Sequence, residues 1–230
     1  MTVRAPTLVV IGGGAVGERY VRQLLRAVAA GRLETERVVV VDRDPACAAR
    51  VHRDARLRFD VADWSEWLDA NLDACGPDDH VVPYHWAPHL FLDWLRRQVR
   101  RAGALVRVGG DWPQRDTPYE GATPSGDRAL SYATWPCPPM CIEPALCPHT
   151  RGPRDWSLAA DLATPRAGEP FDEHVVFRCL HLVYGVGTTP VAEIVAARDR
   201  LVAGLRRGHR TYLVSTSSHC HGLATPLVAG

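Results

Sequence analysis

Short apolar runs alternate with amphipathic stretches over the first 110 residues of the chain. The runs are rich in Val, as expected of buried parallel strands, and the stretches between them repeat apolar residues every three or four positions, which predicts helices. The predicted strands cover residues 8–11, 37–41, 57–59, 80–83 and 104–108. We therefore expect an α/β protein with a doubly wound, mostly parallel sheet.

Proline interrupts this pattern in the middle of the chain. Eleven of the 18 Pro residues lie between Pro113 and Pro170, and each removes a backbone donor and fixes φ. Beyond this segment the pattern predicts strands at 175–183 and 211–215 and a helix at 190–205. Two strands and one helix are too few to bury a core of their own, so we expect them to extend the first sheet.

Composition limits the class of function. The chain has 230 residues, of which 46% are hydrophobic and 23% charged, and its formal net charge is +1. This balance excludes a disordered chain and a polybasic nucleic-acid binder. No run of about 18 uncharged apolar residues occurs, and no signal-peptide pattern follows Met1, so we expect a cytoplasmic protein with no membrane partner.

A glycine-rich turn follows the first predicted strand. Gly12, Gly14 and Gly17 form a G-x-G-x-x-G pattern at the start of an amphipathic helix. In that context Gly12 permits the tight turn, Gly14 lets the backbone approach a pyrophosphate, and Gly17 lets the helix pack closely on the strand. The second strand ends at Asp42, where a carboxylate can accept hydrogen bonds from an adenosine ribose.

These residues resemble the dinucleotide-binding Rossmann family, which includes the nucleotide-binding domains of potassium-uptake regulators and saccharopine-dehydrogenase-like reductases. The resemblance covers about the first 110 residues, and it implies a Rossmann-like sheet that binds NAD. Asp42 favours NAD over NADP because a carboxylate repels the 2′-phosphate, and Arg43 next to it could soften this preference. The residues that the resemblance implies for the cofactor are Gly12, Gly14, Ala15, Val16, Gly17, Asp42 and Arg43.

Two alternatives remain open for the glycine turn. The glycines could serve folding alone, or the site could hold another adenosine compound such as S-adenosylmethionine. Precorrin-2 dehydrogenases have a similar length and glycine turn, but Asp42 and the cysteine-rich continuation depart from their pattern.

Three thiols lie close together in the proline-rich segment. Cys137, Cys141 and Cys147 are followed by His149 in a C-x3-C-x5-C-x-H spacing, which indicates metal ligation or redox chemistry in a cytoplasmic protein. The irregular spacing favours an iron-sulfur cluster. A zinc site is the second interpretation, because the C-x2-C pairs that are usual in zinc sites are absent. Thiols that bind no metal are a third interpretation. We prefer Cys220 as the fourth ligand. The alternatives are Cys179, His149 and a bound substrate.

His residues are the candidates for acid-base catalysis in this chain. All 27 basic residues are Arg, so Schiff-base, P-loop and general-base lysines are excluded. The candidate catalytic residues are His85, after the strand at 80–83, and His219 and His221, on either side of Cys220. Residues 185–189, before Pro190, predict either a second anion-holding turn at a helix N-terminus or a plain strand-to-helix connection.

Together these observations predict three regions and one function. Residues 1–110 form the Rossmann dinucleotide-binding region, 111–170 the inserted Pro- and Cys-rich metal or cluster segment, and 171–230 a β-α-β extension of the same sheet. We expect an NAD(H)-binding redox protein, an oxidoreductase on a small-molecule substrate, with the cluster or metal beside the nucleotide. The alternatives are a non-enzymatic nucleotide and redox sensor and a scaffold with structural zinc. A homo-oligomer is left open.

Overall fold

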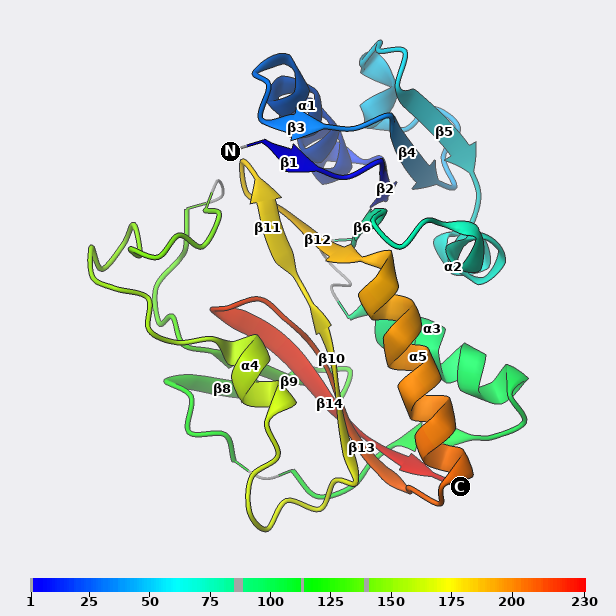
Figure 1. Ribbon diagram of the computed structural model, residues 1–230, viewed down its shortest axis with the longest axis vertical. Helices are drawn as coiled ribbons and strands as arrows, with labels where there is room; N and C mark the ends of the chain where they lie inside the picture. The colour runs from blue at the N-terminus through cyan, green and yellow to red at the C-terminus, as the bar shows by residue number, and fades with distance from the viewer. Residues whose placement is uncertain (1, 85–88, 113, 139–140) are drawn as a thin grey trace. The chain divides into compact units, whose positions relative to one another are not determined.

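A computed structural model describes residues 2–84, 89–112, 114–138 and 141–230 of the chain (Figure 1). The protein is a mixed α/β chain whose larger sheets contain parallel strands, as the sequence predicts. It divides into two compact units. The first unit comprises Met1–Leu90, Pro139–Ile142 and Leu180–Val195, and the second comprises Phe91–Pro138, Glu143–Cys179 and Ala196–Gly230.

The first unit is built on a six-stranded sheet. Its strand order is β11-β12-β6-β2-β4-β5, with β6, β2, β4 and β5 parallel and the β11-β12 hairpin joined antiparallel to β6. The bounds are β2 (Thr7–Ile11), β4 (Arg37–Asp42), β5 (Leu57–Val61), β6 (His80–Val82), β11 (Leu180–Val183) and β12 (Val186–Pro190). A separate parallel pair is formed by β1 (Val3–Arg4) and β3 (Leu33–Glu34).

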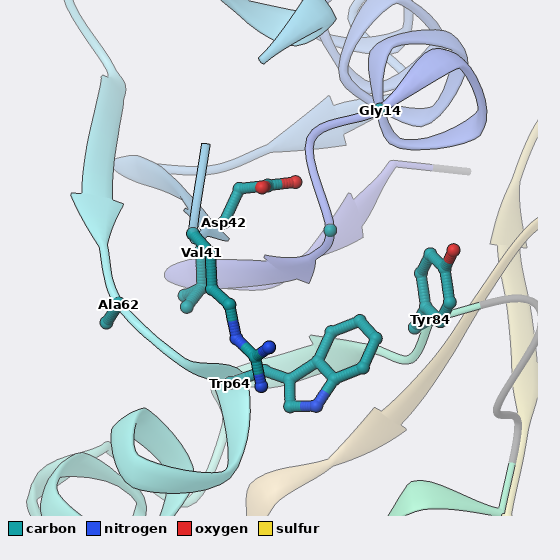
Figure 2. Close-up of a pocket in the computed structure, with 8 residues that line it drawn as sticks. Gly14, Val41, Asp42, Ala62, Trp64 and Tyr84 are labelled. Carbon is teal, nitrogen blue, oxygen red and sulfur yellow. The ribbon is translucent and has the colours of Figure 1, made fainter. Parts of the chain in front are cut away.

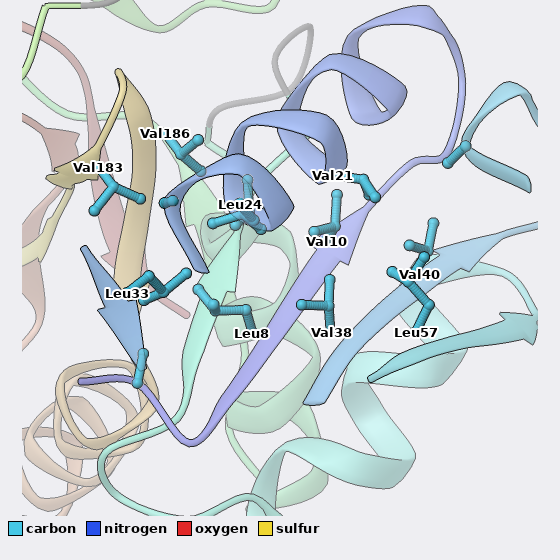
Figure 3. Packing of buried hydrophobic residues seen from close by; sticks show 14 of the residues in the cluster. Leu8, Val10, Val21, Leu24, Leu33, Val38, Val40, Leu57, Val183 and Val186 are labelled. Carbon is cyan, nitrogen blue, oxygen red and sulfur yellow. The ribbon is translucent and has the colours of Figure 1, made fainter. Parts of the chain in front are cut away.

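The core of the first unit lies between this sheet and helix α1 (Ala15–Ala29) (Figure 3). The Val-rich strands and the apolar stripe of α1 supply its side chains, including Val10, Val38, Val21 and Leu24, which are fully or almost fully buried. Helix α2 (Trp64–Asn71) follows β5, and short 3-10 turns are formed by η1 (Ala48–Val51) and η2 (Leu72–Ala74). The parallel strands and helix α1 therefore lie where the periodicity of the sequence predicts them.

The second unit contains a separate six-stranded sheet. Its order is β10-β13-β14-β9-β8, with β7 paired to β14, and only β10 and β13 are parallel. The bounds are β7 (Val106–Val108), β8 (Tyr119–Ala122), β9 (Arg128–Ser131), β10 (Glu173–Arg178), β13 (Thr211–Ser217) and β14 (His221–Ala229). Helix α4 (Leu158–Ala163) packs on this sheet, where Leu158, Leu162 and Leu213 are fully buried.

Two longer helices complete the described chain, α3 (Leu90–Arg101) and α5 (Val191–Arg206). The apolar stripe of α3 is buried, and Phe91 contacts Phe177 of β10 at a ring-centroid distance of 5.3 Å. None of the helices among the described residues is both long enough and apolar enough to cross a bilayer.

The expectation that the last strands extend the first sheet is wrong for most of them. The predicted strand at 175–183 is split into β10 and β11, which belong to different sheets, and β13 pairs with β10 and β14 rather than with β2. The predicted strand at 104–108 is β7, which also pairs with β14. The proline-rich segment contributes β8 and β9, and these give the second sheet enough strands to bury a core.

The predicted turn at residues 185–189 is also different in the structure. Tyr184 and Gly185 have φ values of 48° and 76° and join β11 to β12 as a tight hairpin. Two consecutive positive φ angles match the right-handed twist of a two-residue hairpin turn. The following residues up to Pro190 form β12 and helix α5 begins at Val191, so this segment is not an anion-holding turn at a helix N-terminus.

Candidate functional site

A cavity of about 250 Å³ opens in the first unit, where the parallel strands end (Figure 2). Its lining comes from the last residues of β4 and from the residues that follow β2, β4, β5 and β6 along the chain. The lining residues are Gly12, Gly14, Val41, Asp42, Arg43, Ala62, Trp64 and Tyr84. Four of the seven residues predicted for a cofactor therefore lie around one cavity.

Two of the three glycines are required by the fold itself. Gly12 has a φ of +87°, and a Cβ there would lie 2.8 Å from Cδ2 of Tyr84. A Cβ on Gly17 would lie 1.8 Å from the carbonyl oxygen of Gly12, so only glycine lets α1 approach the turn this closely. These are the structural roles that the sequence predicts for both positions.

Gly14 is different because no contact among the described residues requires a glycine there. It is the N-cap residue of α1 with ordinary extended dihedrals, and a Cβ there would meet no atom of residues 2–84, 89–112, 114–138 or 141–230 within 4 Å. It provides no side-chain hydrogen bond to the helix start, and it lines the cavity. The absent side chain leaves room beside the first turn of α1, where backbone N–H groups favour an anion.

Asp42 ties the end of β4 to the glycine turn. Its Oδ2 accepts a hydrogen bond from the backbone N–H of Gly13 at 2.6 Å, and its Oδ1 accepts one from Asp44 N–H at 2.8 Å. Figure 2 shows this carboxylate pointing toward the turn. A carboxylate offers about four acceptor positions, so Asp42 retains capacity for the hydroxyl groups of a ligand.

Arg43 is turned toward a second carboxylate. Its Nε donates to Oδ2 of Asp63 at 2.8 Å, and Asp63 is also the N-cap of α2, where it accepts from the N–H groups of Ser65 and Glu66. Desolvation opposes ionisation of Asp63, but the Arg43 guanidinium and these N–H groups together hold its pKa below the usual value. The positive charge beside Asp42 is therefore partly compensated.

Two aromatic rings form one side of the cavity. Trp64 and Tyr84 lie with ring centroids 4.6 Å apart at an interplanar angle of 45°. Sequence reasoning missed Trp64, which shares a helical spacing with Trp67, a residue that is buried in the structure. The signal that could have identified it is its position directly after Asp63, the helix cap at the end of a strand.

A second group of chemically active side chains lies in the second unit. The Sγ of Cys137 is 3.3 Å from Nε2 of His221, and Nδ1 of that ring is 2.9 Å from Oγ of Ser131. Ser131 and His221 face each other because they are register partners across β9 and β14. The structure therefore brings together one predicted ligand and one predicted catalytic residue, and Ser131 is an addition to them.

Cys220 lies beside this group and is held in a buried position. Its sulfur accepts a hydrogen bond from Nε1 of Trp156 at 3.4 Å. Burial raises the pKa of the Cys220 thiol to about 11, and the charges of Glu143 and Cys137 contribute to the increase. Cys220 directly precedes His221, the residue whose ring contacts the Cys137 thiol.

Glu143 fixes the turn that carries Cys220. Its buried carboxylate accepts hydrogen bonds from the N–H groups of His219 and Cys220 at 3.0 and 3.2 Å, and from Oγ of Ser218 at 2.7 Å. Sequence reasoning missed this residue, since a Glu within a run of Cys and Pro carries no periodic signal.

The other predicted ligands have separate surroundings. Cys141 belongs to the first unit, where its carbonyl oxygen lies 2.8 Å from Nδ1 of His181. The ring of His149 stacks on Trp135, with centroids 4.8 Å apart. Hydrogen bonds from Thr150 lower the pKa of the Cys147 thiol, whereas burial raises that of Cys179 to about 12. His85 lies outside the described residues.

Across the described ranges of the chain, no group of three or more His, Cys, Asp or Glu side chains is arranged to hold a metal ion. The iron-sulfur cluster and the zinc site remain predictions from the sequence.

Residues 91–229 match AF_1314_C, a family described as the C-terminal domain of an uncharacterized protein. The chain belongs to this family. No curated protein and no solved structure matches the chain.

The AF_1314_C region begins where the second compact unit begins, at Phe91. It includes the second sheet with Cys137, Cys220 and His221, whereas the glycine turn and its cavity lie before it in the chain. The family match therefore covers these three residues, and the cavity is interpreted from its own geometry.

Proposed function

We propose that the first unit binds NAD(H) at the cavity beside the glycine turn, and that the protein is an oxidoreductase acting on a small-molecule substrate. The observation that carries this proposal is Gly14. A glycine that no contact in the described part of the chain requires, placed at the start of a helix and on the wall of a cavity, leaves space that a bound pyrophosphate would use.

The strand order supports the same proposal. From β2 the chain moves to β4 and then β5 on one side, and afterwards to β6 on the other side of β2. This is the order of the first half of a doubly wound sheet, in which ligands bind beyond the strand ends where the order reverses. Gly12 and Tyr84 follow the two strands on either side of that reversal, and both line the cavity.

The chemistry of the lining fits an adenosine dinucleotide. The N-terminus of α1 would bind the pyrophosphate, and Asp42 would accept hydrogen bonds from ribose hydroxyl groups. The cavity is smaller than the roughly 300–1,000 Å³ typical of pockets that enclose a whole ligand, so it would hold only part of the dinucleotide. When bound, the nicotinamide supplies hydride transfer.

The charges around the cavity favour NAD(H) over NADP(H). Asp42 would repel a 2′-phosphate, and the neighbouring Arg43 is engaged by Asp63. The same residues could also hold another adenosine compound, so the test must compare several ligands.

Calorimetric titration of the whole chain tests the proposal. We expect NADH to bind, NADPH to bind more weakly, and S-adenosylmethionine not to bind. Gly14→Val should weaken NADH binding at least about tenfold, which corresponds to about 1.4 kcal/mol. Gly152→Val is a matched control, because a Cβ at Gly152 in the second unit would also meet only an ordinary contact. Equal NADH binding by both variants, or no binding by the unmodified chain, would overturn the assignment.

A further inference from the structure

A chain of three side chains in the second unit has the arrangement of an activated nucleophile. The Cys137 thiol contacts Nε2 of His221 at 3.3 Å, and Nδ1 of the same ring contacts Ser131 Oγ at 2.9 Å. Nucleophilic catalysis uses this order of groups: a nucleophile, a base within hydrogen-bond reach, and a third group that orients the base. This group lies entirely in the second unit and does not rest on the proposed nucleotide site.

The hydrogen bonds of Ser131 determine which nitrogen of His221 carries the proton. The Ser131 hydroxyl donates its single hydrogen to the carbonyl oxygen of Ala133 at 2.6 Å. Toward His221 it must therefore accept, so Nδ1 is the protonated nitrogen of the neutral ring. The lone pair of Nε2 then faces the sulfur of Cys137, which is the orientation needed to accept the thiol proton.

A second thiol makes this group a two-thiol centre. Cys220 directly precedes His221 in the chain, so the Cys137 thiol contacts the residue next to Cys220 at 3.3 Å. The two thiols differ, because Cys137 is partly exposed beside an imidazole whereas Cys220 is buried beneath Trp156. This asymmetry assigns the first attack on a substrate to Cys137 and leaves Cys220 to act second.

The surrounding backbone argues against acyl transfer at this centre. The N–H groups of His219 and Cys220 donate to Glu143, and that of His221 donates to Ser218 Oγ. These three donors are therefore engaged and are not offered to the oxyanion of an acyl intermediate. Thiol-disulfide exchange needs no oxyanion hole, and a pair of thiols matches its two-electron stoichiometry.

We propose that Cys137 and Cys220 form a redox-active thiol pair that reduces small-molecule disulfides, with His221 as the base for Cys137. The Cys137 proton passes to Nε2 of His221, and the sulfur attacks the disulfide. A Cys137–substrate disulfide bond forms, the substrate S–S bond breaks, and the departing thiolate takes the proton from His221.

In the second step the Cys220 sulfur attacks the Cys137 sulfur. A Cys137–Cys220 bond forms, and the second substrate thiol leaves with the Cys220 proton. One disulfide is reduced to two thiols, and two protein thiols are oxidised to one disulfide. An external thiol returns the pair to its reduced form by the reverse exchange.

Reaction of the reduced whole chain with glutathione disulfide tests the proposal. Samples are quenched with iodoacetamide at successive times and digested with trypsin, which cleaves this chain only after Arg. We expect a disulfide between the peptides 129–151 and 211–230, and fragmentation should place it on Cys137 rather than on Cys141 or Cys147. In the unmodified protein Cys137 should be the first of the seven thiols to react.

Variants separate the two steps. Cys220→Ser should stop at a glutathione adduct on Cys137, and Cys137→Ser should give neither product. His221→Gln should slow the first step at least about tenfold, since a positioned base contributes roughly 100-fold or more. Cys75→Ser and His209→Gln are matched controls that should leave the rate unchanged.

Two results would overturn the proposal. The first is a thiol other than Cys137 reacting first in the unmodified protein, which can be observed without any variant. The second is stoichiometric zinc or iron in protein purified without air, lost in Cys137→Ser, because the thiols would then be metal ligands.

Discussion

The carbonyl oxygen of Gly12 lies directly above the Cα of Gly17, so that a Cβ on Gly17 would be 1.8 Å from that oxygen. The obstacle is backbone at the end of β2, which cannot rotate away as a flexible side chain could. Gly14, only three residues earlier, has no atom of any described residue within 4 Å of the corresponding position. The glycine turn therefore contains both a folding requirement and an open position.

The first prediction follows from this contrast. Gly17→Ala should lower the free energy of unfolding by about 3 kcal/mol or more, because either α1 or the turn must move. Gly14→Ala should change it by less than about 1 kcal/mol, the difference between Gly and Ala at an N-cap. Denaturant unfolding of both variants measures the difference. Similar losses in the two variants would contradict this division of roles.

The second prediction concerns the ion pair between Arg43 and Asp63. Asp63→Ser keeps a residue that caps α2 but removes the carboxylate that engages Arg43. The released guanidinium could then bind a 2′-phosphate, so affinity for NADPH relative to NADH should rise about two- to fivefold, in line with exposed ion pairs of up to about 1 kcal/mol.

The control for this change is the double variant Asp63→Ser with Arg43→Ala. It should lose the gain in NADPH binding, because the guanidinium is then absent. If the double variant retains the gain, the ion pair does not determine the preference.

The sequence was sufficient for the local features of the first unit. The Val run of β4 and the stripe of α1 predicted their own burial, since the partner of each is the neighbouring element in the chain. Gly12 and Gly17 were predictable because a turn followed by a helix sets their dihedrals and clearances within a few residues.

Strand partners far apart in the chain were not predictable. Residues 175–183 form one continuous apolar pattern. Such a pattern predicts that the residues are buried, but it does not show that β10 and β11 belong to different sheets. Strand β14 was missed because Pro226 interrupts it. The Pro226 carbonyl oxygen accepts a hydrogen bond from the Gly109 N–H on the side of β14 that faces β9 and β7. Pro226 lies between the residues that pair with β9 and those that pair with β7, so the N–H that proline lacks would point into the gap between these two strands.

The sequence analysis preferred Cys220 as a ligand together with Cys137, and that shared metal site stays a prediction. What the structure shows is a contact between Cys137 and His221, the residue after Cys220, on a strand pair in which β9 and β14 run antiparallel with Ser131 opposite His221. Residue types indicated the chemistry, but only the register of a non-local strand pair could show which side chains meet.

The third prediction is a pH dependence of stability that arises at His80. Burial lowers the pKa of this ring below 6.5, against opposing charges on Asp79 and Asp78, and its Nδ1 contacts Thr188 Oγ1 at 2.9 Å. As the pH falls below about 6.5 the unfolded chain takes up a proton that the folded chain resists, so the folded state loses stability. The unfolding free energy should therefore decrease from pH 7.5 to 5.5.

His80→Gln removes the titrating ring while keeping a polar side chain, so the decrease over this pH range should become smaller. His209→Gln is the matched control, because this ring is partly exposed, whereas the His80 ring is buried. An equal slope in the unmodified protein and in His80→Gln would show that other groups cause the dependence.

The last prediction concerns Glu143 and the turn that holds Cys220. Glu143→Gln replaces one carboxylate oxygen by an amide donor, and it leaves at least one of the three donors that Glu143 receives without a partner. We expect a loss of about 2–3 kcal/mol, because hydrogen bonds to a charged acceptor are strong and an unpaired buried donor is costly. Asp199→Asn is the control, since the exposed pair with Arg198 should contribute less than about 1 kcal/mol.

The loosened turn should also expose the buried Cys220 thiol, so its alkylation by iodoacetamide should be faster in Glu143→Gln than in Asp199→Asn. Unchanged stability together with unchanged Cys220 alkylation would show that the turn holds its shape without this carboxylate.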